Sequence, residues 1–182
     1  MASQLDQGRE AFDRREWAQA YSYLATASDQ LPLDPEDLER LATAAYLTGR
    51  DADSDEVLAR AHHAWLQAGN PQRAVGAAFW LGFGLLVRGE EARGNGWLAR
   101  AQRIVDDGDL DCAERGSLLL PVALAHLDRR EPENAYAAFL AAAEIGARFG
   151  DPDLVTLGRL GRGQALIRSG RTAEGVALLD EA

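Results

Sequence analysis

A spacer of four positions recurs five times in this 182-residue sequence, and it constrains the fold more than any other feature. Its later positions follow the first by 12, 16 and 19 residues, and successive copies begin 34, 40, 41 and 40 residues apart. The first two positions hold small residues, the third a large apolar residue and the fourth alanine: Gly8, Ala20, Leu24 and Ala27; Ala42, Ser54, Leu58 and Ala61; Gly82, Gly94, Leu98 and Ala101; Ala123, Ala135, Phe139 and Ala142; Gly163, Gly175, Leu179 and Ala182. A repeat of this length predicts a stack of helical hairpins, and such stacks usually bind partners.

The intervals inside the spacer predict two helices per copy. Its last three positions are separated by four and then three residues, which places them on one face of a helix. Glycine can take the left-handed conformation that ends a helix, and we expect a turn seven residues after each first position, at Arg15, Gly49, Gly89, Arg130 and Gly170. Gly69 and Gly150 are predicted to stop helices between copies. Each copy therefore predicts a first helix, a tight turn and a second helix that packs closely against the first.

The breaks between copies carry signals for the start of a helix. Asp34, Asn70 and Asp151 each precede a proline, which predicts a capping side chain followed by proline at the first helical position. Pro121 falls inside a predicted helix, where it indicates a kink or a late start. About ten helices are predicted, over residues 3–14, 17–30, 36–48, 52–68, 72–88, 91–106, 111–128, 132–149, 153–169 and 172–182.

The composition argues against several functions. A formal net charge of −10 disfavours binding to nucleic acid or to anionic membranes, because both need concentrated positive charge. No apolar run reaches the ~18 residues of a membrane span, and the N-terminus has no signal-peptide profile. The one cysteine, Cys112, cannot form a disulfide within the chain. These features predict a cytoplasmic protein.

The spacer resembles the tetratricopeptide repeat (TPR) over nearly the whole chain. The first copy matches best, with the signature order given by Gly8, Trp17, Ala20, Leu24, Ala27 and Pro32. The later copies exceed the usual period of about 34 residues, so their helices are expected to be about a turn longer. The resemblance implies an all-α, right-handed TPR-like solenoid of about five helical hairpins. We expect one domain, 1–182, with repeats at about 1–34, 35–70, 71–109, 110–150 and 151–182.

Two stretches resemble a narrower group of proteins. Residues 69–101 and 163–182 are similar to the sensory repeat segment of actinobacterial LuxR-type transcriptional regulators, in which such repeats precede a C-terminal helix-turn-helix. We find no helix-turn-helix in this sequence. The resemblance therefore implies a bacterial regulatory segment that binds a protein or a ligand and belongs to a longer protein. The alternative is a stand-alone TPR scaffold or self-association module with no role in transcription.

The C-terminal end predicts a further contact. The sequence stops at Ala182, on the fourth spacer position, without the polar capping helix that covers the last apolar face of a solenoid. We expect either a longer protein or pairing of this end with a second copy in a homodimer.

The inward-facing side of the first helix in each hairpin is the predicted binding surface. In repeats of this kind these positions line the concave side, and they include Tyr46, Phe79, Phe83, Leu86, Leu120, Leu124, Gln164 and Arg168. Two interpretations remain open. The residues are core, enclosed by tightly curled repeats, or they form a groove for a protein, a peptide or a small apolar effector.

No constellation of residues predicts catalysis. His62 and His63 are neighbours on one predicted helix and point about 100° apart, so they cannot hold one ion together. His126 and Cys112 lie far from them in the sequence. We therefore expect no metal, no cofactor and no enzyme.

Tryptophans and paired glycines are interpreted as packing positions. Trp17, Trp65, Trp80 and Trp97 fall near predicted helix interfaces, where burial is the ordinary outcome. Two pairs of glycines lie inside predicted helices: Gly82 and Gly84, and Gly94 and Gly96. A phosphate-binding loop would instead place its glycines between a strand and a helix. These glycines are expected to be points of close helix packing.

Overall fold

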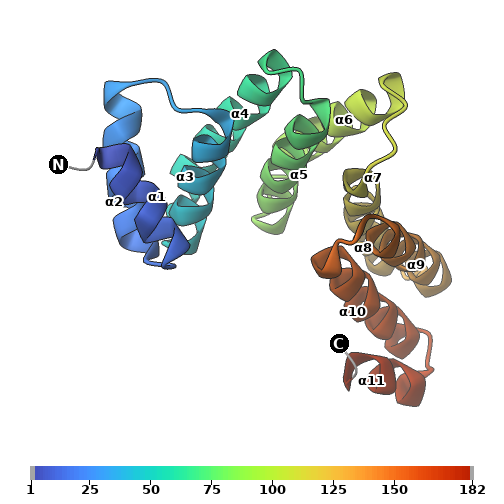
Figure 1. The fold of residues 1–182 in the computed structure, drawn as a ribbon. Helices are drawn as coiled ribbons and strands as arrows, with labels where there is room; N and C mark the ends of the chain where they lie inside the picture. Colours follow the sequence, from blue (N-terminus) through green and yellow to red (C-terminus); the bar gives the residue numbers. More distant parts are fainter. Residues whose placement is uncertain (1–2, 181–182) are drawn as a thin grey trace. The chain divides into compact units, whose positions relative to one another are not determined.

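The structure, a computed structural model, describes residues 3–180, and within that range it contains eleven α-helices and no strand (Figure 1). The helices are α1 (Gln4–Asp13), α2 (Trp17–Gln30), α3 (Pro35–Leu47), α4 (Asp51–Gln67), α5 (Pro71–Val87), α6 (Glu91–Asp107), α7 (Ala113–Ser117), α8 (Leu119–Asp128), α9 (Pro132–Phe149), α10 (Pro152–Arg168) and α11 (Thr172–Asp180). Each of the ten predicted helices is present, and the number rises to eleven because one of them is divided.

The divided helix is the one in which proline was expected to disturb the chain. α7 ends at Ser117, Leu118 forms a turn, and α8 begins at Leu119. Pro121 has no N–H to donate to the carbonyl of Ser117, four residues earlier, so the helical hydrogen-bond ladder is interrupted there. The predicted kink is confirmed.

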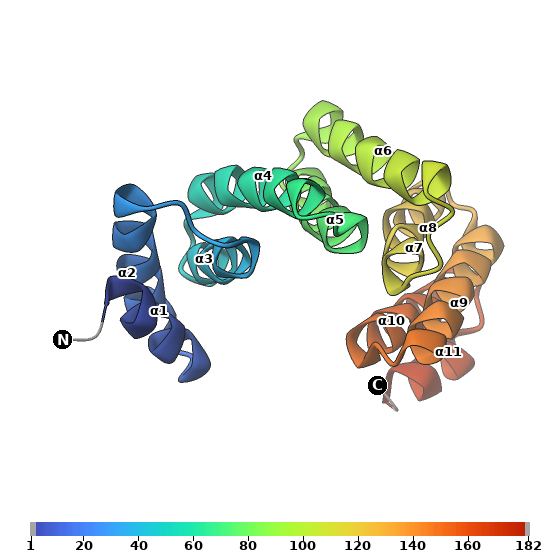
Figure 2. The ribbon, with the colours of Figure 1, turned by 45° about the horizontal axis from the view of Figure 1, so that its top comes forward.

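The helices group into two compact units, Met1–Trp97 and Leu98–Ala182, and the boundary falls inside α6. The first unit contains the hairpins α1–α2 and α3–α4, then α5 and the start of α6. Within this unit α3 and α4 lie side by side (Figure 2). The second unit contains the rest of α6, then α7, α8 and α9, and the hairpin α10–α11. The assignment of 1–182 to a single domain stays a prediction.

The first two spacer positions are buried in all five copies, and they bring the two helices of a hairpin together. A Cβ atom on Gly94 of α6 would lie only 2.8 Å from the carbonyl oxygen of Gly82 on α5. In the second copy the Ser54 hydroxyl donates a hydrogen bond of 3.0 Å to the Ala42 carbonyl. The small residues at these positions therefore set the close approach, as predicted. Ala182, the last spacer position, lies outside the described residues.

The predicted turn residues all have positive φ. The φ angles are 60° at Arg15, 74° at Gly49, 81° at Gly89, 60° at Arg130 and 87° at Gly170. Gly69 and Gly150, predicted to stop the helices between copies, have φ of 71° and 70°. Arginine carries a Cβ that crowds the backbone in this conformation, so two of the turns are held at a cost that the glycine turns avoid.

Two of the three predicted capping side chains form their hydrogen bonds. The Asn70 side chain accepts from the backbone N–H of Arg73 at 3.1 Å, and Asp151 accepts from Leu154 at 2.9 Å. Asp34 occupies the N-cap position of α3 but makes no capping hydrogen bond through its side chain, so that prediction is wrong. The Asp34 carbonyl accepts the backbone N–H of Asp37 at 3.0 Å instead, and this N–H is one that a capping side chain would otherwise bind.

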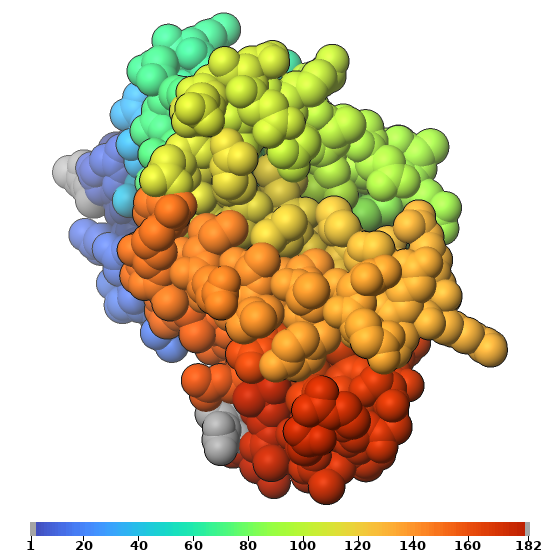
Figure 3. Space-filling model, turned by 90° about the vertical axis from the view of Figure 1, so that its right-hand side faces the viewer, coloured from blue at the N-terminus to red at the C-terminus, as the bar shows by residue number. Residues whose placement is uncertain are grey.

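The second unit is packed most tightly between α9 and α10. In the space-filling view the orange residues of α9 lie directly against the red residues of the last hairpin (Figure 3). The ring of Phe139 occupies the space beside Gly161, where an added Cβ would lie 2.3 Å from a ring carbon. A Cβ on Gly158 would lie 2.8 Å from the Phe139 carbonyl oxygen. Gly161 is therefore required by the ring of the large spacer residue of α9, and Gly158 by the close approach of the α9 backbone.

Candidate functional site

The predicted groove residues are divided between the two units and differ in exposure. In the first unit Tyr46 is exposed, Phe83 and Leu86 are partly buried and Phe79 is buried; in the second unit Gln164 and Arg168 are exposed, Leu124 is partly buried and Leu120 is buried. Phe79 and Leu120 are therefore part of the core. The exposed members remain candidates for contact with a partner.

An aromatic cluster on α5 extends from this core to the surface. The rings of Phe79 and Phe83 stack, with centroids 5.5 Å apart and an interplanar angle of 15°. Trp80 meets Phe79 edge to face at 5.1 Å, yet 55% of Trp80 is exposed. The prediction that Trp80 is a core residue is wrong, because it lies on the open face of α5. The prediction of burial is confirmed for Trp65, which is buried, and in part for Trp17 and Trp97, which are partly buried.

Exposed apolar residues occur on the first helices of two consecutive hairpins, α3 and α5. Near the end of α3, Tyr46 is 60% and Leu47 is 48% exposed, and at the end of α5 Val87 is 72% exposed. We call Tyr46, Leu47, Trp80, Phe83 and Val87 the α3/α5 apolar surface. The two helices share one core cluster that contains Leu41, Ala42 and Ala77, so both are fixed within the first unit.

Gly84 lies one turn after Trp80 on α5, and packing does not explain it. A Cβ on Gly84 would meet only a side-chain nitrogen of Arg88, at the ordinary contact distance of 3.4 Å. Gly96 has nothing within 4 Å. The interpretation of paired glycines as points of close packing is therefore confirmed for Gly82 and Gly94 and wrong for Gly84 and Gly96.

A buried carboxylate joins α1 to α3 in the same unit. Asp37 is fully buried and accepts from Arg9 Nε at 2.9 Å and Arg9 Nη2 at 2.5 Å, and from Arg40 Nη1 at 2.7 Å. Burial acts to raise the pKa of Asp37, but the hydrogen bonds from Arg9 and Arg40 outweigh it and hold the pKa below its usual value. Sequence reasoning missed this pairing, since nothing local links residues 28 positions apart.

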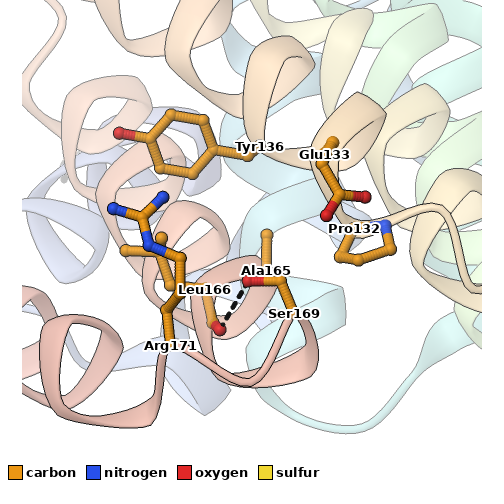
Figure 4. Close-up of a pocket in the computed structure, with 7 residues that line it drawn as sticks. All are labelled: Pro132, Glu133, Tyr136, Ala165, Leu166, Ser169 and Arg171. Atoms are coloured by element: carbon orange, nitrogen blue, oxygen red, sulfur yellow. Dashed lines mark hydrogen bonds between the residues drawn. The ribbon is translucent and has the colours of Figure 1, made fainter.

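The second unit contains a hollow of about 190 Å³ between the start of α9, the end of α10 and the turn before α11. Its lining residues are Pro132, Glu133, Tyr136, Ala165, Leu166, Ser169 and Arg171. Figure 4 shows Pro132 and Glu133 on one side of Ala165, with Tyr136 and Arg171 on the other. Ser169 closes one edge, where its hydroxyl donates to the Leu166 carbonyl at 2.9 Å. No sequence motif marked this site, because its residues come from two repeats.

The described residues offer no cluster of side chains that would hold a metal ion. No group of three or more histidine, cysteine, aspartate or glutamate side chains in residues 3–180 is arranged to hold a metal ion. His62 Nδ1 lies 2.8 Å from the Ala74 carbonyl oxygen, and His63 Nδ1 lies 2.7 Å from that of Ala59. Burial raises the pKa of the Cys112 thiol, which disfavours the reactive thiolate. In the same range, none of the helices is both long and apolar enough to cross a membrane.

Comparison with known proteins places the chain by fold. No protein-family model matches the sequence, and no curated protein does. Apo RapI shares 14% identity with a TM-score of 0.72, and the match covers 98% of this chain and 51% of RapI. The Rap conjugation gene regulator of plasmid pLS20, solved with the Phr* peptide, shares 16% identity with a TM-score of 0.73, over 96% of this chain and 50% of that one.

A third structure names the architecture. A Podosopora anserina protein with nearly identical TPR-like repeats matches at 14% identity and a TM-score of 0.61, over 98% of this chain and 90% of its own. The chain has a TPR-like fold. The predicted all-α stack of helical hairpins is thereby confirmed. This TPR-like chain spans about half the length of the Rap structures that it matches.

Proposed function

We propose that this chain is a regulatory module that binds a protein or peptide through the α3/α5 apolar surface. The observation that carries the proposal is Trp80, which is 55% exposed in a helix whose other large side chains are mostly enclosed. Tryptophan dominates binding energy at many interfaces when it enters a partner's pocket. Apolar side chains exposed together mark such contacts, and Trp80 lies on the same face of α5 as Val87, which is 72% exposed.

The surroundings of Trp80 support the same function. Phe79 and Phe83 contact the indole of Trp80 and restrict its movement before a partner binds. The ring therefore loses little conformational entropy on binding. Gly84, one turn further along α5, adds no side chain of its own next to the indole, and the atom nearest to the position of its missing Cβ is a side-chain nitrogen of Arg88. The Rap regulator of pLS20, of the same fold, was solved with a peptide, which makes peptides the first class of partner to test.

Selection from a random peptide library tests the proposal. Peptides selected on the whole chain are expected to lose at least about tenfold in affinity on Trp80→Ala and a smaller factor on Tyr46→Ala. Phe149→Ala is the matched control, because Phe149 is a 38% exposed aromatic residue in the second unit. Selected peptides that bind all three variants with equal affinity would place the binding surface elsewhere.

The narrower proposal is the sensory segment of a LuxR-like bacterial transcriptional regulator that acts in the cytoplasm. It rests on the similarity of residues 69–101 and 163–182 to that group, and it makes the chain a non-catalytic part of a larger protein. The reading frame after residue 182 tests it. A helix-turn-helix encoded there supports the regulator, whereas a stop codon favours the alternative, a stand-alone scaffold.

Self-association through the last hairpin belongs to that alternative. Val176 on α11 is 45% exposed, and Ala173 and Ala177 beside it are also exposed. If this face pairs with a second copy, light scattering of the wild-type chain gives a dimer and Val176→Glu gives a monomer. A wild-type monomer at all accessible concentrations rules this mode out.

A further inference from the structure

We propose that the hollow between α9, α10 and α11 is a binding site for a small zwitterion of the size of an amino acid. The inference does not rest on the proposed function, because the hollow lies wholly in the second unit and the α3/α5 apolar surface lies in the first. It adds an effector site to a chain otherwise expected to bind macromolecules.

The first argument is the placement of opposite charges. Glu133 borders one side of the hollow and Arg171 the other, with Ala165 between them (Figure 4). Glu133 attracts an ammonium group, and Arg171, although paired with Glu174, still has N–H donors for a carboxylate. A molecule that carries an ammonium group and a carboxylate satisfies both sides.

The second argument is the orientation of Arg171. Its Nε donates to Glu174 Oε1 at 2.8 Å and its Nη2 donates to Oε2 at 2.5 Å. A guanidinium has five N–H donors, so this pair fixes the plane of the group and leaves both donors of Nη1 for a ligand carboxylate. Glu174 therefore acts as a positioning residue for the cationic side of the site.

Glu133 supplies the anionic side. Among residues 3–180 its carboxylate has no hydrogen-bond or ion-pair partner, although Arg171 lies across the same hollow. The carboxylate is thus free to accept hydrogen bonds from an ammonium group. It lies in the first turn of α9, where a negative charge is favourable, so its presence costs the fold little.

The third argument is the apolar lining and the size. Pro132, Ala165, Leu166 and the ring of Tyr136 offer carbon surface to an aliphatic side chain. The ring is held in place by Arg162, whose Nη2 donates to the Tyr136 hydroxyl at 3.0 Å. A volume of about 190 Å³ is below the ~300 Å³ where pockets for drug-sized molecules begin, and it suits a single small amino acid better than a peptide of several residues.

Calorimetric titration of the whole chain tests the site, with L-leucine and γ-aminobutyrate as probes that differ in the distance between their charges. We expect saturable binding of at least one of them with a Kd of about 1 mM or tighter. If L-leucine binds, leucinamide, which lacks the carboxylate, and N-acetyl-L-leucine, which lacks the ammonium group, are each expected to bind at least about tenfold more weakly.

The variants assign the two charges. Arg171→Gln is expected to remove the preference for L-leucine over leucinamide, and Glu133→Gln the preference over N-acetyl-L-leucine. Arg171 and Glu133 are both exposed, so the variants are expected to stay folded. Glu144→Gln is the control, because Glu144 is an exposed glutamate of α9, the helix that carries Glu133. No saturation by either zwitterion up to about 10 mM, or binding of leucinamide or N-acetyl-L-leucine as tight as that of L-leucine, overturns the proposal. Unchanged binding of peptides to the α3/α5 apolar surface in these variants separates this result from a failure of the proposed function.

Discussion

The guanidinium of Arg9 on α1 donates hydrogen bonds to both carboxylate oxygens of Asp37 on α3, at 2.9 Å and 2.5 Å. Since Asp37 is fully buried, removal of Arg9 leaves an interior charge compensated by Arg40 alone. We expect Arg9→Ala to lower the free energy of unfolding by about 2 kcal/mol. This is less than the ~3–5 kcal/mol of a fully buried pair, because the Arg9 side chain is 40% exposed. Urea unfolding measures the difference.

The control for Arg9 lies on the same stretch of chain. Arg14 forms ion pairs with Glu10 and Glu16, and all three side chains are exposed. Arg14→Ala is therefore expected to change the free energy of unfolding by less than about 0.5 kcal/mol. A loss for Arg9→Ala no greater than that for Arg14→Ala would show that the bond to Asp37 contributes little.

Asp37 also makes the stability depend on pH. Burial acts to raise its pKa, but Arg9 and Arg40 hold the pKa in the folded chain below that in the unfolded chain. The carboxylate therefore stabilises the fold fully above the unfolded pKa of about 3.9, and this stabilisation is lost as the pH falls through the lower folded pKa. We compare the free energy of unfolding of the wild type with that of Asp37→Asn. The wild type is expected to be more stable by the same amount from about pH 7 to pH 5, and by a smaller amount below about pH 4. Urea titrations at each pH test this, and an advantage that grows on acidification contradicts it.

Local signals explain how much of the fold could be predicted. The spacer predicts two local features of the fold: small residues where two helices touch, and a turn seven residues after each first position. Both hold at Gly82 and Gly94 and at all five turns, because hairpin geometry is decided within about 20 residues of sequence. The kink at Pro121 was predictable for the same reason, since the missing N–H acts four residues away.

The candidate sites depend on contacts that no local pattern encodes. Trp80 occupies a helix that is apolar nearly all round, so periodicity could not tell its open face from its buried one. Arg9 bonds to Asp37, which lies 28 positions away on another hairpin. The hollow near Tyr136 combines residues of two repeats, and its charges come together only after both hairpins have packed.

Glycine at two of the turns is expected to stabilise the chain. Arg15 and Arg130 both have φ of 60°, where a side chain with a Cβ costs about 1–2 kcal/mol. Glycine removes that cost but adds about 0.5–1 kcal/mol of entropy loss, so Arg15→Gly and Arg130→Gly are each expected to gain about 0.5–1 kcal/mol. Thermal unfolding of the single variants measures the gain.

Neighbouring arginines provide the control for these turns. Arg14 and Arg129 have φ of −82° and −79°, which any residue adopts easily. Arg14→Gly and Arg129→Gly are therefore expected to lower the stability by up to about 1 kcal/mol, through the entropy of the unfolded chain. If glycine has the same effect at Arg15 as at Arg14, the left-handed turn is not a source of strain.

Two glycines of α6 are expected to respond to alanine in opposite directions. At Gly94 the new methyl group would lie 2.8 Å from the Gly82 carbonyl oxygen and 2.9 Å from Leu86 carbons. Backbone cannot yield as a side-chain tip does, so Gly94→Ala is expected to cost about 1–3 kcal/mol. Gly96, one half-turn further on, has nothing within 4 Å, and Gly96→Ala is expected to gain up to about 1 kcal/mol through helix propensity. Urea unfolding of both variants decides the matter, and a stabilising Gly94→Ala would mean that the hairpin does not depend on the close approach of α5 and α6.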